Sequence, residues 1–382
     1  MANPLRELTR LGQSVWYDSF RRGLLLSGEL ARYVEEDGLT GLTTNPAIYE
    51  KAISGSRDYE AELSSLLPRR DLDAKAIYEE LALHDIKAAA DLLRPVYERT
   101  DRRDGYVSLE VSPVLALDTD GTLSEARRLW RALGRENVMI KVPGTSEALP
   151  AIRQLLSEGV NVNVTLLFSR DAYSRVVEAY LSALEERADR GEDLRHVASV
   201  ASFFVSRVDT LVDKLLDRLA SQGSDDRRKR GEALRGRVGV ANAKLAYQDY
   251  RTLTRSARFT RLAERGAHPQ RLLWASTSTK NPRYRDVMYV EELIGPDTVD
   301  TMPPATFEAF RDHGRAKPTL EEGIEGARAA LAELADLGIS IDDVTDQLLA
   351  QGVQLFAEPF AKLLAAVETR RSSSAGTGAA AP

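Results

Sequence analysis

Short apolar segments alternate with longer segments of helical periodicity along most of the chain. The short segments are rich in β-branched residues, whereas in a stretch such as DAYSRVVEAYLSALEERADR the apolar residues recur every three or four positions, as on the buried face of a helix. This alternation is typical of a parallel sheet with crossover helices. The pattern predicts eight strands, at residues 14–18, 39–45, 106–112, 137–142, 160–168, 197–204, 271–276 and 298–302.

Eight strands with intervening helices most simply close into a (β/α)8 barrel, and a two-domain α/β enzyme is the competing arrangement. We expect a single domain over residues 1–370, because a strand and helix pattern resumes after the charged segment 221–239. That segment therefore reads as a surface excursion rather than a linker. Helical periodicity after the eighth strand predicts extra C-terminal helices on the barrel, and the small residues of 371–382 predict a disordered tail.

The composition of the chain excludes several kinds of partner and of catalytic chemistry. The 382 residues are 43% hydrophobic, which suffices for a large core, and their net charge of −6 argues against nucleic acid or anionic membrane as a partner. The chain has no cysteine, and its four histidines are scattered, so we expect no thiol catalysis, no metal and no cofactor. No apolar run approaches the roughly 18 residues that span a bilayer, and no signal peptide is evident, so we expect a cytoplasmic protein.

Polar residues stand at the ends of several predicted strands, where barrels of this kind carry their chemistry. Residues two apart share one face of a strand, so polar residues at that spacing form a row along a strand that should be buried. Lys141 ends an apolar run, and a lysine is almost never buried unless it is paired. The ordinary interpretation is a lysine that reaches solvent from a strand end. Together, however, five strand ends would bring Lys141, Asp18, Glu110, Asn45, Asn163 and Thr165 over one barrel mouth.

Such a set suits one kind of reaction. A neutral lysine amine can attack a ketone to form a Schiff base, which then acts as an electron sink for carbon–carbon bond cleavage without a metal or an organic cofactor. Carboxylates nearby would supply the general acid and base for dehydration of the carbinolamine and for proton transfer at the substrate hydroxyl. The sequence therefore predicts a lysine-dependent aldolase type of chemistry.

Five motifs resemble, in order and spacing, the transaldolases of the pentose phosphate pathway. They are GLTTNPAI, SLEVSP, NVMIKVPGTSEALPAIRQLLSEGVNVNVTLLFS, FFVSRVD and WASTSTKNP, within a match over residues 10–368. The resemblance implies a circularly permuted class I aldolase barrel. It also implies transfer of a dihydroxyacetone unit from sedoheptulose 7-phosphate to glyceraldehyde 3-phosphate, giving erythrose 4-phosphate and fructose 6-phosphate. Small sugar phosphates would then be its partners, and it would be a monomer or a homodimer.

The resemblance also implies residue roles. Lys141 resembles the Schiff-base lysine, and Asp18 resembles the general acid and base at the C4 hydroxyl. Glu110 and Thr165 resemble the pair that holds the proton-shuttling water. The residues that would bind substrate are Asn45, Asn163 and Ser202 at the dihydroxyacetone hydroxyls and Arg207 at the phosphate.

Two motifs depart from the family pattern. The family usually has Ser-Pro-Phe where this chain has Ser202-Phe203-Phe204, and related fructose-6-phosphate aldolases carry a tyrosine at a pocket position here. Phe204 therefore favours group transfer over simple aldol cleavage. The usual Ser-Phe-Arg appears as STSTKNP, so Ser276 and Lys280 are assigned as the second phosphate contact, with Ser278 as an alternative.

Two other functions compete with this interpretation. The run VLALDTDGTL resembles the first motif of haloacid-dehalogenase-type phosphatases, with Asp118 as nucleophile, and the acidic pair in SDDRRK would serve magnesium. Against this, Pro113 discourages a strand before Asp118, Thr122 and Glu125 form a capping-box pattern for a helix, and SDDRRK lies in a charged stretch typical of a solvated loop. A non-catalytic barrel is the third hypothesis, and it predicts an inert Lys141.

Overall fold

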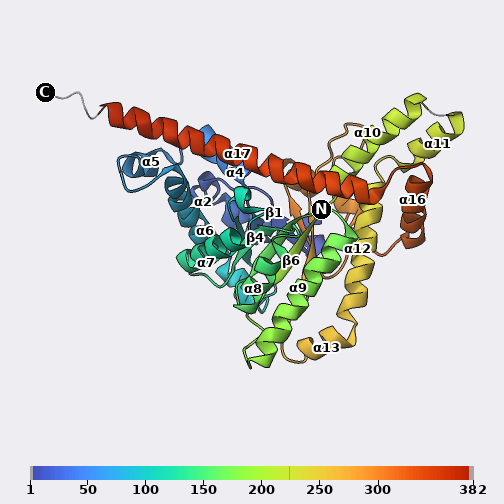
Figure 1. Cartoon of the computed structure of the whole chain (residues 1–382), viewed down its shortest axis with the longest axis horizontal. Coiled ribbons are helices and arrows are strands. Elements are labelled where there is room, and N and C mark those ends of the chain that lie inside the picture. The colour runs from blue at the N-terminus through green and yellow to red at the C-terminus, as the bar shows by residue number, and fades with distance from the viewer. Residues whose placement is uncertain (1–2, 223, 378–382) are drawn as a thin grey trace.

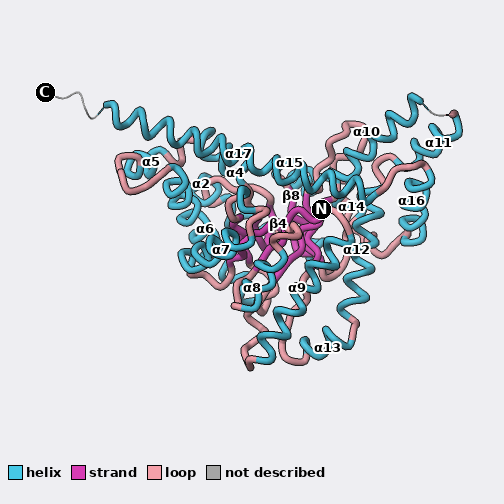
Figure 2. Tube along the Cα trace, viewed as in Figure 1, coloured by secondary structure: helices cyan, strands magenta, loops and turns pink. Residues whose placement is uncertain are grey.

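Eight parallel strands close into a barrel in chain order, each paired with the next and the eighth with the first. The computed structural model describes residues 3–222 and 224–377. The strands are β1 (Gln13–Tyr17), β2 (Leu39–Thr43), β3 (Tyr106–Glu110), β4 (Val138–Pro143), β5 (Val162–Leu167), β6 (Ser199–Phe204), β7 (Arg271–Ala275) and β8 (Thr298–Met302). All eight coincide with predicted strands, and Figure 2 shows them at the centre of a ring of helices. The predicted (β/α)8 barrel is confirmed.

Helices follow the strands and cover the barrel. They are α1 (Pro4–Arg10), α2 (Arg22–Leu26), α3 (Glu29–Glu36), α4 (Pro46–Gly55), α5 (Glu60–Leu66), α6 (Ala74–Arg99), α7 (Thr119–Leu133), α8 (Leu149–Ser157), α9 (Arg170–Asp189), α10 (Ser206–Gln222), α11 (Asp225–Leu234), α12 (Val238–Thr254), α13 (Ala257–Ala263), α14 (Met288–Glu292), α15 (Pro304–His313), α16 (Ile324–Asp336) and α17 (Ile341–Thr377). A short 3₁₀ turn, η1 (Pro113–Leu115), follows β3. No helix in the described ranges is long and apolar enough to cross a membrane.

The alternation of side chains along each strand divides the core into two apolar clusters. One lies between the sheet and the helices and includes Val107, Ile140 and Val164. The other extends from outer helices, with Val212 of α10 and Leu334 of α16, to the barrel strands, where it includes Trp16. Gly41 on the neighbouring strand makes room for that ring, because a Cβ at Gly41 would lie 2.4 Å from Trp16 Cε2. These layers hold the strands rigidly, so that side chains at their carboxyl ends are presented from a fixed frame.

Polar side chains close the amino-terminal end of the barrel. Trp16 Nε1 donates to Asp104 Oδ1 at 2.6 Å, and Arg271 Nη1 donates to Ser14 Oγ at 2.7 Å. Arg271 also lies 3.5 Å from Asp104, with both side chains almost fully buried. This end of the barrel is therefore filled by its own residues, which leaves the opposite end for a ligand.

The predicted extra helices are confirmed as α16 and α17. Helix α17 is 37 residues long and crosses the barrel from the α16 side toward α5 (Figure 1). It packs on α4, α6 and α10, and also reaches β5. The predicted tail starts at residue 371, but residues 371–377 are the last part of this helix. Residues 378–382 lie outside the described residues.

Two local expectations were wrong. The cap of α7 is Asp118, whose Oδ1 accepts from Gly121 N at 2.9 Å, so the helix begins before the predicted Thr122. Glu125 instead accepts from Ser112 N at 2.6 Å. The acidic pair of SDDRRK lies at the start of helix α11 and not in a loop. Asp118 caps α7 in place of Thr122 because its short side chain reaches the free N–H groups of the first turn.

Candidate active site

A cavity of about 640 Å³ lies at the carboxyl ends of the strands. Its wall contains residues from strand ends, from α4, from the start of α10 and from α17. The sequence-predicted residues that line it are Asp18, Asn45, Lys141, Thr165, Ser202, Phe204, Arg207, Ser276 and Lys280, together with the alternative Ser278. Glu110 and Asn163 are buried beside this wall and contact residues that line it. The fold thus brings together residues more than 250 positions apart in the sequence.

Lys141 is a buried lysine with one carboxylate beside it. Its side chain is 6% exposed, and Nζ lies 3.2 Å from Glu110 Oε2. The register of β4 places Lys141 opposite Glu110 on one side and Asn163 on the other. Nζ also donates to the backbone oxygen of Thr44 at 3.1 Å. The amine is therefore held in place at the floor of the cavity by a charge and a carbonyl.

Glu110 is tuned by its surroundings. Burial raises the pKa of its carboxyl to about 7; the nearby Lys141 opposes this rise, and Asp18 adds to it. Apart from the contact with Lys141, its carboxyl oxygens have no polar partner among the described residues, and the buried Thr165 Oγ1 has no hydrogen-bond partner among them. A carboxyl with a pKa near neutral can both take and release a proton at physiological pH.

Asp18 follows β1 and lines the cavity. Its backbone N–H donates to Met302 O at 2.8 Å, which fixes the chain at the barrel rim. Its Oδ1 accepts from Thr43 Oγ1 at 2.8 Å. Burial raises the pKa of this carboxyl, while Lys141 and the hydrogen bond from Thr43 act against the rise. Two carboxyls with raised pKa values therefore stand close to one amine, as acid and base chemistry requires.

A short chain of hydrogen bonds orients the amide of Asn163. Ser202 Oγ donates to Asn163 Oδ1 at 2.7 Å, and Asn163 Nδ2 donates to Ser108 Oγ at 3.1 Å. Asn45 plays a structural part as well, because its side chain caps α4 by accepting from Ile48 N at 3.1 Å. Both amides thus have fixed orientations before any ligand binds.

Cations gather at the side of the cavity formed by β6 and β7. Arg207 lies in the first turn of α10, with Cζ 5.4 Å from the ring centre of Phe204 and 6.0 Å from that of Phe356. Burial lowers its pKa, and Asp18 partly offsets this. Burial and then Arg207 lower the pKa of Lys280. Two desolvated cations beside a helix N-terminus favour an anionic group such as a phosphate.

The loop after β7 contributes the remaining predicted residues. Ser276 has a left-handed backbone with φ of 56°, and its Oγ lies 3.0 Å from Ser206 Oγ. Lys280 Nζ donates to Ser278 Oγ at 2.6 Å. This loop thus brings Ser276, Ser278 and Lys280 to the same cavity.

Several cavity residues were missed by the sequence analysis. Leu355 and Phe356 come from α17, and Lys51 comes from α4. The Phe356 ring centre lies 5.5 Å from Lys141 Nζ. The helical pattern of the C-terminal region predicted a helix, but no local signal said that it would reach the barrel mouth. The i, i+4 spacing of Ala47 and Lys51 on α4 is a weak signal that could have pointed to Lys51.

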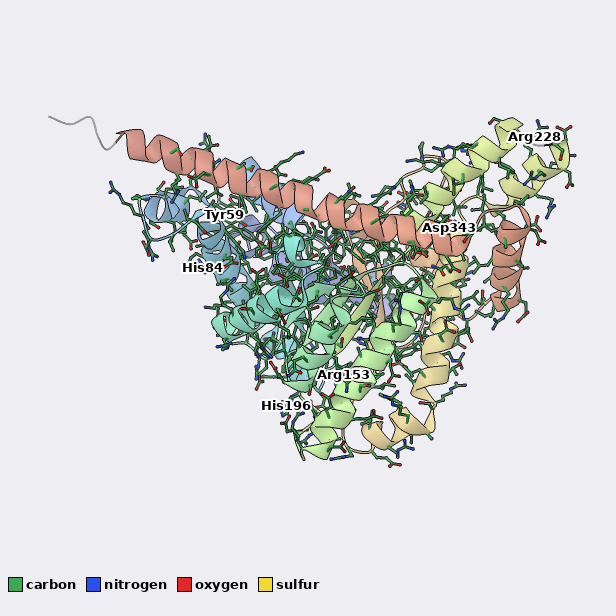
Figure 3. The ribbon with its side chains drawn as sticks, viewed as in Figure 1. Tyr59, His84, Arg153, His196, Arg228 and Asp343 are labelled. Atoms are coloured by element: carbon green, nitrogen blue, oxygen red, sulfur yellow. The ribbon has the colours of Figure 1, made fainter. Side chains whose placement is uncertain are left out.

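Histidines take no part in this cavity. Figure 3 shows His84 and His196 on the outside of the molecule, and their side chains are 65% and 43% exposed. Neither of the other two histidines lines the cavity. Within residues 3–222 and 224–377, no cluster of three or more metal-ligating side chains is present.

The chain is similar to known proteins along almost its entire length. A family model described as Transaldolase/Fructose-6-phosphate aldolase matches residues 15–367. A transaldolase of Trichodesmium erythraeum is 47% identical over 97% of this chain and 98% of its own length. A protein named transaldolase 2 from Nostoc punctiforme is 48% identical, over 96% of this chain and 97% of its own. A transaldolase of Thiobacillus denitrificans is 48% identical, over 96% and 99%.

Proposed function

The chain belongs to the transaldolase/fructose-6-phosphate aldolase family, and we propose that it works as a transaldolase through a Schiff base on Lys141. The donor is sedoheptulose 7-phosphate and the acceptor is glyceraldehyde 3-phosphate. The products are erythrose 4-phosphate and fructose 6-phosphate, as the resemblance to the pentose phosphate transaldolases implies, and the proposed compartment is the cytoplasm. The observation that carries this proposal is the buried Lys141 amine, 3.2 Å from Glu110 at the floor of a cavity with cations on its wall.

Lys141 and Asp18 carry out both halves of the proposed reaction. Lys141 Nζ attacks the C2 carbonyl of the ketose, and the carbinolamine loses water to give a Schiff base. Asp18 takes the proton of the C4 hydroxyl as the C3–C4 bond breaks, and the electron pair of that bond moves into the protonated imine. The aldose leaves, and a dihydroxyacetone enamine remains on Lys141. The enamine then attacks the aldehyde carbon of the acceptor, and Asp18 returns the proton to the new hydroxyl.

Glu110 and Thr165 serve the proton transfers at the carbinolamine. Loss of water requires a proton for the leaving hydroxyl, and hydrolysis of the final Schiff base requires a base for the attacking water. A Glu110 carboxyl with a pKa of about 7 fits both tasks. The Thr165 hydroxyl, which none of the described residues hydrogen-bonds, fits as the second contact of that water.

The cationic wall orients the sugar. Arg207 presents a planar fork of donors that suits a phosphate, and Lys280 adds a second positive charge. Asn45, Asn163 and Ser202 contact the hydroxyls of the dihydroxyacetone part. Holding the phosphate at one end and the ketone at Lys141 fixes the bond to be broken relative to Asp18.

Trapping tests the covalent step directly. The protein is incubated with fructose 6-phosphate, reduced with borohydride and digested, and the added dihydroxyacetone mass is located by mass spectrometry. We expect the adduct on Lys141 in the native protein and in Lys51→Ala, which removes another lysine of the same cavity. Lys141→Ala should show neither adduct nor transfer. Full activity in Lys141→Ala would refute the proposal.

Aldol cleavage of fructose 6-phosphate without an acceptor is the second candidate function, because the family contains both activities. Phe204 at the cavity favours transfer, since it offers no hydroxyl to hold a water for hydrolysis. Release of free dihydroxyacetone in the absence of an acceptor measures this activity. We expect it to be slow in the native protein and faster in Phe204→Tyr.

A further inference from the structure

Strand β5 bends at the residue next to Thr165. Leu166 has φ of 61°, in the left-handed region that a side-chain-bearing residue rarely adopts. The register of β5 on β6 shifts here: Val164 pairs with Ala201 and Leu167 pairs with Phe203. Two residues of β5 thus face one of β6, which is a β-bulge. A left-handed leucine persists only where its surroundings hold it, and such strain gathers at functional sites.

Helix α17 provides the surroundings that hold this bend. A Cβ added at Gly352 would lie 3.0 Å from Leu166 Cδ2 and 3.6 Å from Phe168 Cε2, so the leucine side chain packs directly on the helix backbone. Leu348 and Phe356, one turn before and after Gly352, belong to the same apolar cluster as Leu166. Figure 1 shows this part of α17 lying over the barrel. A Cβ at position 352 would require the Leu166 side chain to shift by a few tenths of an ångström, and a larger side chain would require more.

The bend lies directly beside Thr165. On the β4 side Thr165 O accepts from Gly144 N at 2.7 Å, but the bulge interrupts the ladder on the β6 side. Thr165 is thus held by β4 on one side and adjoins the bend at Leu166 on the other. Thr165 lines the cavity, and its Oγ1 is a buried hydroxyl without a hydrogen-bond partner in the described ranges.

We propose that Gly352 is a positioning residue: its close contact with Leu166 holds the bulge of β5 and so directs the Thr165 hydroxyl into the active site. This rests on the proposed function, in which Thr165 and Glu110 share a water. The contact bears first on the chemical step, because Leu166 adjoins Thr165, whereas Arg207 meets α17 at Phe356, one turn beyond Gly352. Helix α17 is thereby a working part of the site.

Substitutions of Gly352 separate this role from a structural one. Gly352→Ala and Gly352→Leu both improve intrinsic helix propensity, so stability alone predicts no loss of activity from the smaller change. We expect kcat to fall by about tenfold or more in Gly352→Leu and less in Gly352→Ala, with KM for fructose 6-phosphate within about twofold of native, since misplacement of a reacting group acts on turnover. The controls are Gly326→Ala and Gly326→Leu on α16, where an added Cβ meets nothing within 4 Å.

Exchanging the sizes of the two contacting side chains should rescue the activity. Gly352→Leu combined with Leu166→Ala restores volume at the contact, and we expect it to regain most of the lost kcat. Borohydride trapping on Lys141 in the native protein reports the proposed function separately. If the native protein forms the adduct but Gly352→Leu, folded by circular dichroism, keeps native kcat, the inference is wrong. If Gly352→Leu does not fold, a native kcat in Gly352→Ala together with no gain from the swap overturns it.

Discussion

Lys141 Nζ and Glu110 Oε2 lie 3.2 Å apart on adjacent strands that pair these two residues in register. Neither side chain is more than 6% exposed. An ion pair so deeply buried costs desolvation, and removing one partner leaves the other charge uncompensated. We therefore expect each member of this pair to control the protonation state of the other.

Replacing Glu110 should change the pH dependence of turnover. The pKa of this carboxyl is about 7, so it gains its negative charge as the pH rises through 7. The ionised form is the base for hydrolysis of the Schiff base, so native kcat should rise with pH across this range when this hydrolysis limits turnover. Glu110→Gln should lose this rise and lower kcat by about 10²-fold. Steady-state rates of transfer from pH 5.5 to 8.5 measure both.

Asp118→Asn is the matched control for Glu110→Gln. Asp118 is exposed and caps α7, and asparagine caps a helix as well as aspartate does. Native rates and a native pH profile are expected. Magnesium-dependent phosphate release that Asp118→Asn abolishes would instead support the phosphatase reading.

Replacing Arg207 should weaken binding of phosphorylated substrates. Its guanidinium lies against Phe204 and Phe356, at the cationic side of the cavity. Arg207→Ala should raise KM for glyceraldehyde 3-phosphate by about 10- to 100-fold, the loss of one charge-assisted contact, and should alter kcat much less. Unphosphorylated glyceraldehyde as acceptor is the internal control, with an unchanged KM. Equal KM values for the phosphorylated acceptor in both proteins would contradict the phosphate role.

Phe356 should keep water from the covalent intermediate. Its ring centre lies 5.5 Å from Lys141 Nζ, and the side chain is almost fully buried while lining the cavity. Phe356→Ala should open a path for water to the Schiff base, so free dihydroxyacetone should increase by about tenfold relative to transfer, a modest share of what exclusion of water contributes. Leu355→Ala is the control, because this neighbour is 50% exposed. An unchanged ratio of cleavage to transfer would show that the ring has no such part.

The barrel and most of the site were predictable because their signals are local. Each strand is a short, largely apolar run, and the polar rows of β3 and β5 recur with the period of two that a strand imposes. Lys141 was predictable because a lysine at the end of an apolar run is rarely buried without a partner. The cap at Asp118 was missed because two capping patterns overlap within five residues, and the choice depends on which N–H groups each side chain reaches.

The contributions of α17 were not predictable for a different reason. The contacts of Phe356 with Lys141 and of Gly352 with Leu166 join residues more than 180 positions apart, and nothing in the helical pattern specifies where the helix lies. The same holds for Thr44, whose backbone oxygen binds Lys141 Nζ and has no sequence signature. Packing of whole elements decides these contacts.

The last prediction concerns stability and Asp300. This side chain is fully buried on β8, and Thr277 Oγ1 donates to its Oδ1 at 3.1 Å. Burial raises its pKa from the ordinary 3.8 to about 8. Between these two values the folded chain holds a proton that the unfolded chain has released, so the free energy of unfolding falls as the pH rises, by at most about 1.4 kcal/mol per pH unit. The stabilisation is complete below about pH 4 and is lost by about pH 8.

Asp300→Asn should therefore flatten the dependence of stability on pH, because an amide does not titrate. Denaturant unfolding at a series of pH values from 5 to 8 measures this, with the exposed Asp120→Asn as control, whose curve should run parallel to that of the native protein. Some slope should remain in Asp300→Asn, since burial also raises the pKa values of Glu110 and Asp209 to about 7. Parallel curves for Asp300→Asn and the native protein would mean that Asp300 is ionised in the folded chain throughout this range.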